Sequence, residues 1–312
     1  MLNFAYKDKT CLIKNQNYLG IPNRTLIFAV RVEDDMKKIC ALTMVRNNEF
    51  FLRRWVAWYG SQLGRENLYV FLDGTDQILE GDYHDVHITF CEHVDDPVLA
   101  GDRRRIDYLS QQAAELLKTY DLVIGTDVDE FLIPDPSLNL TLAEFLNRQK
   151  ITISLSALGI DVGQHMHSEG PFDESRPFLG QRRYALLSSR YSKANVLASP
   201  VAWGSGFHRI RNHNFHIAPD LYLFHFGCAD YNRFRALFDD KEHIRNGWGG
   251  HLARRIRTID IITSSEPRMW EQTIKRARKL QNIFRQWQAW NKPSMLGHRW
   301  VVEIPERFRN IV

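Results

Sequence analysis

One apolar segment that ends in acidic residues decides the fold: Leu122-Val123-Ile124-Gly125-Thr126-Asp127-Val128-Asp129-Glu130-Phe131-Leu132. Its first residues form a short apolar run, which is typical of a strand buried on both faces. Alternate residues of an extended segment point the same way, so Asp127 and Asp129 can share one face. Two carboxylates at a strand end suit Mg²⁺ or Mn²⁺ together with substrate phosphates. The same pair could instead cap a neighbouring helix or bond loop amides, and its surroundings must decide between the two.

Strand-like and helix-like segments alternate on the N-terminal side of this segment. The predicted strands are 39–45, 68–72, 86–90 and 122–125, and the predicted helices are 49–63 and a segment marked by Ile106, Leu109, Ala113, Leu116 and Leu117. Such alternation builds right-handed βαβ units, so we expect an α/β fold with a mostly parallel central sheet flanked by helices. Ligands of such sheets bind beyond the carboxyl ends of the strands. The polar residues 46–49, 73 and 127–129 are therefore predicted to meet at one edge.

The pattern changes after Pro134. Strands are predicted at 151–158, 184–189 and 221–226, and C-terminal helices at 231–245 and 268–290. In the last of these, one apolar stripe comprises Trp270, Ile274, Ala277, Leu280, Phe284 and Trp287, opposite Lys275, Arg278, Lys279 and Arg285. The stripe favours a helix packed on the domain, with a helix lying on an anionic membrane surface as the alternative.

The composition is that of an ordinary globular chain. Its 312 residues include 41 Lys and Arg, 37 Asp and Glu, and 44% hydrophobic residues, and no apolar run is long enough to cross a membrane. Residues 1–10 show no secretory signal, and the four cysteines form no CxxC pair, which argues against a zinc cage and a disulfide framework. We therefore expect a cytoplasmic protein with reduced thiols, either free or associated with a membrane.

The charge is unevenly distributed along the chain. Residues 241–312 contain 15 Lys and Arg against 6 Asp and Glu, whereas residues 1–240 contain 26 against 31. A basic C-terminal region indicates an anionic partner such as a phosphate, a lipid headgroup or a nucleic acid, unless it is simply a solvated helix face. We expect no nucleic-acid partner, because the aromatic residues of this region follow a helical core stripe rather than an exposed stacking surface.

Three elements in this order resemble a known enzyme family: residues 45–49 (VRNNE), residues 68–76 (LYVFLDGTD) and residues 127–132 (DVDEFL). They look like the family 2 glycosyltransferases, and more closely like relatives around family 92, in which a strand ending in DVDEF is characteristic. The similarity covers residues 39 to about 134 and is looser beyond. It implies a glycosyltransferase-A-type fold, a nucleoside-diphosphate sugar as donor (most commonly a UDP-sugar) and Mn²⁺ or Mg²⁺ as cofactor.

The resemblance also implies roles for individual residues. Glu49 and Asp73 would line the pocket for the base and ribose of the donor. Asp129 would bind the metal, and Asp127 would contact the donor and the metal. His225 resembles a late-chain metal ligand of this fold, although a buried histidine bonded to a backbone carbonyl is an equal alternative. The sequence departs from the usual family 2 pattern at residues 73–76, where a second acidic residue and a serine are commoner.

Basic residues supply candidates for binding the diphosphate. Residues 103–105 are three consecutive arginines, and an arginine fork can bind a pyrophosphate through two hydrogen bonds. Arg104 is our choice among them, and Arg46 and Lys193 could act similarly. His208, His213 and His216 are expected on a loop near the acceptor or at the surface.

The predicted reaction is transfer of the sugar to a hydroxyl of a glycan, lipid or protein, with inversion as the resemblance implies. A carboxylate would take the hydroxyl proton, and Asp161, Asp173 and Glu174 are the candidates. Asp161 is preferred because it follows a predicted strand. The alternatives are a metal-dependent nucleotidyltransferase or phosphoesterase, and a non-catalytic protein that binds anions or nucleic acid.

The predicted organisation has four parts. Residues 1–38 would form an N-terminal arm or edge hairpin, and residues 39–134 the half of the domain that binds the nucleotide sugar. Residues 135–240 would form the acceptor-binding half of the same domain. Residues 241–312 would form a basic helical region.

Overall fold

The structure is a computed structural model that describes residues 6–7, 10–11, 36–213, 216–239, 249–287 and 289–312. The chain divides into two units, Met1–Met36 and Lys37–Val312. In the first unit, β1 (Tyr6–Lys7) and β2 (Thr10–Cys11) pair antiparallel. Most of the predicted N-terminal arm, 1–38, lies outside the described residues.

The second unit is a mixed α/β fold. Its strands are β3 (Ile39–Val45), β4 (Leu68–Asp73), β5 (His87–Cys91), β6 (Leu122–Gly125), β7 (Glu130–Pro134), β8 (Ser154–Gly163), β9 (Tyr184–Leu187), β10 (Val196–Leu197), β11 (Ile217–Cys228), β12 (Arg285–Gln286), β13 (Ala289–Pro293) and β14 (Val301–Glu303). Its described α-helices are α1 (Glu49–Leu63), α2 (Val98–Leu116), α3 (Leu142–Asn147), α4 (Tyr231–Ala236), α6 (Gly249–Ser264) and α7 (Trp270–Ile283). Short 3₁₀ turns occupy Arg65–Asn67, Pro136–Leu138, Phe178–Gly180, Ser205–Phe207 and Glu306–Phe308.

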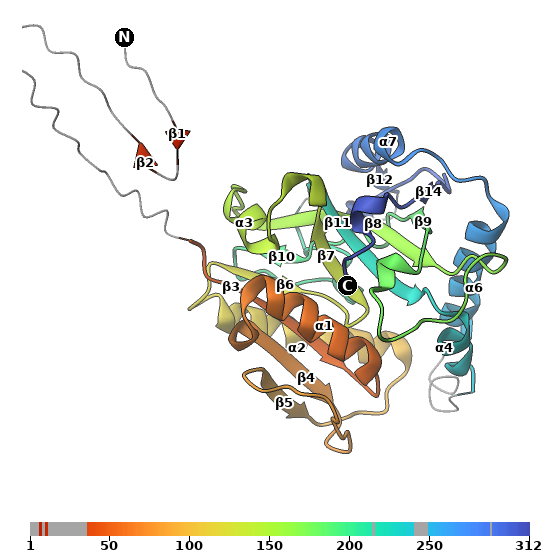
Figure 1. Cartoon of the computed structure of the whole chain (residues 1–312). Helices are drawn as coiled ribbons and strands as arrows, with labels where there is room; N and C mark the ends of the chain where they lie inside the picture. The colour runs from red at the N-terminus through yellow and green to blue at the C-terminus, as the bar shows by residue number, and fades with distance from the viewer. Residues whose placement is uncertain (1–5, 8–9, 12–35, 214–215, 240–248, 288) are drawn as a thin grey trace, which may run out of the picture. The chain divides into compact units, whose positions relative to one another are not determined.

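A central sheet organises this unit (Figure 1). Strands β6, β3, β4 and β5 are neighbours in that order and all run parallel, which confirms the predicted βαβ arrangement. The sheet continues through β10, β8, β9 and β14 by antiparallel pairings. Strand β11 joins β8 in parallel and β7 antiparallel. The α/β prediction is confirmed. The antiparallel pairings involve strands that follow β6 in the chain, and β6 itself has one antiparallel neighbour, β10.

Helices α1 and α2 cover opposite faces of the parallel strands. Strand residues alternate between the faces, so Ala41 packs in the core with α1, whereas Cys40 and Leu42 pack with α2. The sequence sets the limits of α1, because the Asn48 side chain accepts a hydrogen bond from the Phe51 amide at its start and Gly64 ends it. These two helices hold the strand ends at a fixed edge of the sheet.

The helices of the C-terminal third differ from their prediction in three places. Helix α4 ends at Ala236, although the predicted helix ran to 245, and residues 240–248 lie outside the described residues. Helix α6 was not predicted. Helix α7 ends at Ile283 rather than 290, because Phe284 is extended and the chain turns into the β12–β13 hairpin. The stripe that suggested a longer helix ends with Trp287, whose side chain is 96% exposed.

The bounds of β8 change the expected position of Asp161. Strand β8 begins and ends later than the predicted 151–158, so Asp161 lies inside the strand and not after it. Within the described part of the chain, no helix is long and apolar enough to cross a membrane.

Candidate active site

A pocket of about 670 Å³ lies at the carboxyl ends of the parallel strands, and we call it the strand-end pocket. It is lined by Met44, Val45, Arg46, Asn47, Asn48, Asp73, Phe90, Cys91, Glu92, His93, Val94, Asp96, Val98, Leu99, Gly101, Asp102, Arg104, Arg105, Tyr108, Asp127, Val128, Asp129, Arg190, Tyr191, Lys193, Gly206, His208 and Arg255. The prediction that polar residues after β3, β4 and β6 meet at one edge is therefore confirmed for Arg46, Asp73 and the Asp127/Asp129 pair.

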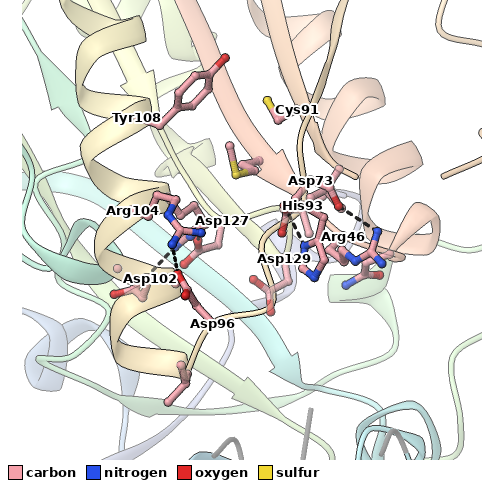
Figure 2. Close-up of a pocket in the computed structure, with 18 of the residues that line it drawn as sticks. Arg46, Asp73, Cys91, His93, Asp96, Asp102, Arg104, Tyr108, Asp127 and Asp129 are labelled. Carbon is pink, nitrogen blue, oxygen red and sulfur yellow. Dashed lines mark hydrogen bonds and ion pairs between the residues drawn. The ribbon is translucent and has the colours of Figure 1, made fainter. Parts of the chain in front are cut away.

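Figure 2 shows how the labelled side chains are distributed. One side of the pocket carries Asp96, Asp102, Arg104 and Asp127, the other carries Arg46, Asp73 and His93, and Asp129 lies between them. Tyr108 on α2 and Cys91 on β5 stand at a separate, less polar end. The pocket is thus lined by both charged and apolar side chains.

Asp127 is held by two cations. Its Oδ1 accepts a hydrogen bond from Arg105 (2.7 Å), and its Oδ2 accepts one from Lys193 (2.7 Å). Burial would raise the pKa of this carboxyl, but Lys193 and Arg105 outweigh burial and hold the pKa well below its usual range. Asp127 is therefore an ionised anchor that fixes the positions of both cations.

Lys193 is also tied to a second carboxylate. Its Nζ lies 2.5 Å from Oε1 of Glu130, a fully buried residue at the start of β7. Burial raises the pKa of Glu130 to about 7, and the charge of Lys193 opposes that rise. The lysine is thereby clamped between two acidic residues beside the pocket.

Asp129 contacts a buried histidine that belongs to a chain of polar groups. Nε2 of His225 lies 3.4 Å from Oδ2 of Asp129, and Nδ1 is 2.7 Å from Oδ1 of Asp161. Asp161 also accepts a hydrogen bond from Thr258 on α6 (3.1 Å), and the ring of Tyr191 stacks on His225 (3.7 Å between centroids). Burial would lower the pKa of His225, but Asp129 and Asp161 outweigh it and raise the pKa to about 9.

The strand register creates this chain. Strand β11 lies between β7 and β8, which places His225 opposite Glu130 on one side and Asp161 on the other. Gly227, two residues later, has no room for a side chain. A Cβ on Gly227 would stand 2.7 Å from Nε2 of His225 and 2.9 Å from Oδ2 of Asp129, so only glycine leaves that space open.

The spacing of Asp129 and His225 is compatible with one divalent cation, which would bind Nε2 of His225 in place of the proton that the two carboxylates favour there. Two ligands that each lie about 2.1 Å from one ion can be 3.4 Å apart, so the spacing of these two atoms fits. Asp161 bonds Nδ1 of His225, as outer groups commonly do for a metal-bound imidazole. The space preserved by Gly227 adjoins both ligand atoms.

The predicted three-ligand set is not assembled. Asp127 uses both carboxylate oxygens on Arg105 and Lys193, and a cation beside it would face those two positive charges. No group of three His, Cys, Asp or Glu side chains arranged for a metal occurs among the residues that the structure describes. The fit is therefore limited to the pair Asp129 and His225, with further ligands left to the substrate.

The predicted donor-binding residues separate into two groups. Arg46, Asp73 and Arg104 line the pocket with Asp127. Arg46 bonds the Asp73 carbonyl (2.9 Å) and Asp76, and Arg104 pairs with Asp96. Glu49 does not line it, because its Oε1 accepts hydrogen bonds from the amides of Glu80 and Gly81 and from Tyr83. That carboxylate fixes the loop after β4 to the start of α1.

The predicted catalytic carboxylates are spread over different places. Asp173 and Glu174 lie in an exposed loop, where Asp173 bonds Ser175 and Glu174 pairs with Arg233. Neither lines the strand-end pocket. Asp161 is buried behind His225, and both of its oxygens accept hydrogen bonds.

The structure adds residues to the pocket that had not been singled out from the sequence. Arg190 and Tyr191 come from the loop after β9, and Arg255 comes from α6. His208, expected near the acceptor, lines the pocket too, and its Nδ1 is 2.7 Å from the Arg190 carbonyl oxygen. Arg255 could have been found from the helical spacing of Leu252, Ile256 and Ile259, whereas nothing local marks Arg190.

Comparisons with known proteins give no family assignment. No family model matches the chain, and no curated protein matches it. Among solved structures, it is similar to a mannosyltransferase from Pyrobaculum calidifontis in complex with GDP-Man and Mn²⁺ (TM-score 0.34, 11% identity, 74% of this chain and 76% of that one). It is also similar to a mannose-1-phosphate geranyltransferase from Thermus thermophilus (TM-score 0.29, 10% identity, 73% of this chain), of which it spans only 65%. Similarity at this level assigns no activity, so the function must come from the chemistry of the pocket.

Proposed function

We propose that the protein is a metal-dependent glycosyltransferase that uses a nucleoside-diphosphate sugar. The observation that carries the proposal is that exposed apolar side chains and charged groups, Asp129 among them, line the same strand-end pocket. Such a donor has two parts, a flat nucleoside and a charged diphosphate. A pocket of about 670 Å³ has the capacity for such a molecule.

The apolar side chains of the strand-end pocket suit a nucleoside. Phe90, Val94 and Leu99 are exposed large hydrophobic residues, and all three line this pocket. Exposed apolar side chains that cluster in a pocket indicate a ligand. Asp73 lies at this strand edge with its Oδ1 3.0 Å from His93, where a carboxylate can accept hydrogen bonds from ribose hydroxyls.

The charged side chains of the strand-end pocket suit a diphosphate. Arg105 and Lys193 are held in place by Asp127. The guanidinium groups of Arg190 and Arg255 make no hydrogen bond or ion pair within the described part of the chain, although the charges of Tyr191, Asp129 and Asp161 outweigh burial and raise the pKa of Arg255. Positioned cations of this kind stabilise the negative charge that develops on a leaving group.

Asp129 and His225 are the residues that would hold the metal. Mn²⁺ or Mg²⁺ bound there would supply positive charge to the departing diphosphate. A histidine ligand favours Mn²⁺ over Mg²⁺. Asp161 would orient His225 through Nδ1, so we assign it as a positioning residue and leave the base unassigned.

The proposal is tested by measuring thermal stability with a panel of sugar nucleotides, with and without Mn²⁺. Ligands that bind the native state raise its apparent stability. We expect a nucleoside-diphosphate sugar, with UDP-sugars first in the panel, to raise the melting temperature when Mn²⁺ is present. Turnover should then release the nucleoside diphosphate.

Two results would contradict this function. One is the absence of stabilisation by every sugar nucleotide tested. The other is release of a nucleoside monophosphate and a sugar phosphate, because those products identify a phosphoesterase.

A further inference from the structure

A second pocket adjoins the first, and we call it the C-terminal pocket. It has a volume of about 920 Å³, and its lining includes Asp161, Arg190, Arg257, Trp287, Lys292 and Arg299. Arg190, Tyr191 and His208 line both pockets. A molecule in the C-terminal pocket would therefore reach the boundary of the strand-end pocket.

The lining of the C-terminal pocket is strongly basic. It includes five cationic residues, Arg190, Arg257, Arg285, Lys292 and Arg299. Asp161 is the single acidic residue among the described residues that line it, and its oxygens already bind His225 and Thr258. The positive charge of this pocket is thus not balanced by its own lining.

Four of these cations have no ion-pair partner within the described part of the chain: Arg190, Arg257, Lys292 and Arg299. The fifth, Arg285, donates to the carbonyl oxygens of Gln281 and Asn282. Burial and the charges of Arg209 and Arg190 lower the pKa of Lys292. Arg190, Arg257 and Arg299 are exposed to solvent, so an anion that binds among them gains charge-assisted contacts without competing with a carboxylate of the described chain.

We propose that the C-terminal pocket binds the acceptor, and that it selects an acceptor sugar that carries phosphate groups. Arginine and lysine side chains bind phosphate oxygens through charge-assisted hydrogen bonds. Trp287 lines the same pocket and is almost fully exposed, which suits contact with the apolar face of a sugar ring. This assignment of an acceptor rests on the proposed transferase function.

The test measures binding of glucose 6-phosphate by calorimetry, with glucose and inorganic phosphate as comparison probes. The informative variant is Arg257→Gln/Arg299→Gln, because both residues line the C-terminal pocket and neither lines the strand-end pocket. The matched control is Lys275→Gln/Lys279→Gln. These two exposed lysines of α7 line neither pocket, and their loss changes the net charge equally.

We expect glucose 6-phosphate to bind more tightly than glucose or inorganic phosphate. The Arg257/Arg299 variant should lose about tenfold or more in affinity, since charged contacts are removed. The lysine control should bind as the wild type does. UDP binding in the presence of Mn²⁺ should be equal in all three proteins, which separates this inference from the function of the strand-end pocket.

Four results would overturn the inference. Glucose 6-phosphate binding could be absent at millimolar concentration, or equally weakened by both double substitutions. Inorganic phosphate could bind as tightly as glucose 6-phosphate, which indicates a simple anion site. Phosphatidylglycerol vesicles could bind in an Arg257- and Arg299-dependent way without any binding of glucose 6-phosphate, which indicates a membrane contact. Failure of UDP binding alone would contradict the proposed function and leave the phosphate selectivity standing.

Discussion

The two neighbouring pockets contain similar cations in different electrostatic settings. In the strand-end pocket, Arg104, Arg105 and Lys193 each have a carboxylate partner within the protein. In the C-terminal pocket, Arg257 and Lys292 have none among the described residues. Carboxylate partners fix Arg104, Arg105 and Lys193 before a ligand arrives, whereas Arg257 and Lys292, like Arg190 and Arg255, leave positive charge that an anionic ligand can neutralise.

This difference relates to what each pocket would do. A diphosphate leaving group gains charge during the reaction, and prepositioned donors stabilise that charge without reorganising. Binding an anionic acceptor requires a net attraction, which unbalanced cations provide. Substituting one lysine in each pocket should therefore have opposite effects on stability.

The largest effect is expected in the strand-end pocket for Lys193→Met. This substitution leaves Glu130 buried without its cation, and breaking a buried ion pair destabilises strongly. We expect the free energy of unfolding to fall by about 3 kcal/mol in chemical denaturation. Adding Glu130→Gln should restore at least half of the lost stability. If Lys193→Met lowers the free energy of unfolding by less than about 1 kcal/mol, the pairing of Lys193 with Glu130 does not stabilise the fold as we expect.

The next prediction concerns Gly227→Ala, which acts on Asp129 and His225 in the strand-end site. The new Cβ would press against His225 and Asp129, so we expect Mn²⁺ affinity to fall by about 10- to 100-fold. The control is Gly170→Ala, where an added Cβ meets no atom within 4 Å. Calorimetric Mn²⁺ titration decides, and equal affinities in the two variants would show that the space beside Asp129 is not a cation site.

The smallest effect is expected for Lys292→Met in the C-terminal pocket. Because burial, and after it the charges of Arg209 and Arg190, disfavour the charged form of Lys292, its removal should raise the free energy of unfolding by about 0.5–1 kcal/mol. The lowered pKa of Lys292 means that the unfolded chain binds more protons between the folded and unfolded pKa values, so wild-type stability rises with pH there. The difference in free energy of unfolding between variant and wild type should shrink as pH approaches about 10.4. A variant that is less stable than the wild type at pH 7 would contradict the claim that the charge of Lys292 destabilises the fold.

Local sequence patterns predicted the parallel half of the fold well. The strand at 39–45, the helix at 49–63 and the strand at 122–125 have the predicted bounds, because apolar runs, a capping asparagine and a terminal glycine are local signals. The two aspartates after β6 were placed at the correct edge for the same reason.

The rest of the site depends on long-range pairing that no local pattern contains. His225 meets Asp161 only because β11 inserts between β7 and β8. Asp127 was expected to bind metal, but Lys193, which is 66 residues away, occupies it. Helix α6, which supplies Arg255 and Thr258, was missed even though its apolar residues have helical spacing.

The central claim is that the strand-end pocket binds a nucleoside diphosphate together with a metal at Asp129. The most direct measurement is calorimetric titration of UDP into the wild type and into Asp129→Asn, each with and without Mn²⁺. We expect Mn²⁺ to tighten UDP binding to the wild type by at least about tenfold and to leave the variant unchanged, with both proteins equally folded. Equal enhancement by Mn²⁺ in the two proteins, or no UDP binding to either, would contradict the claim.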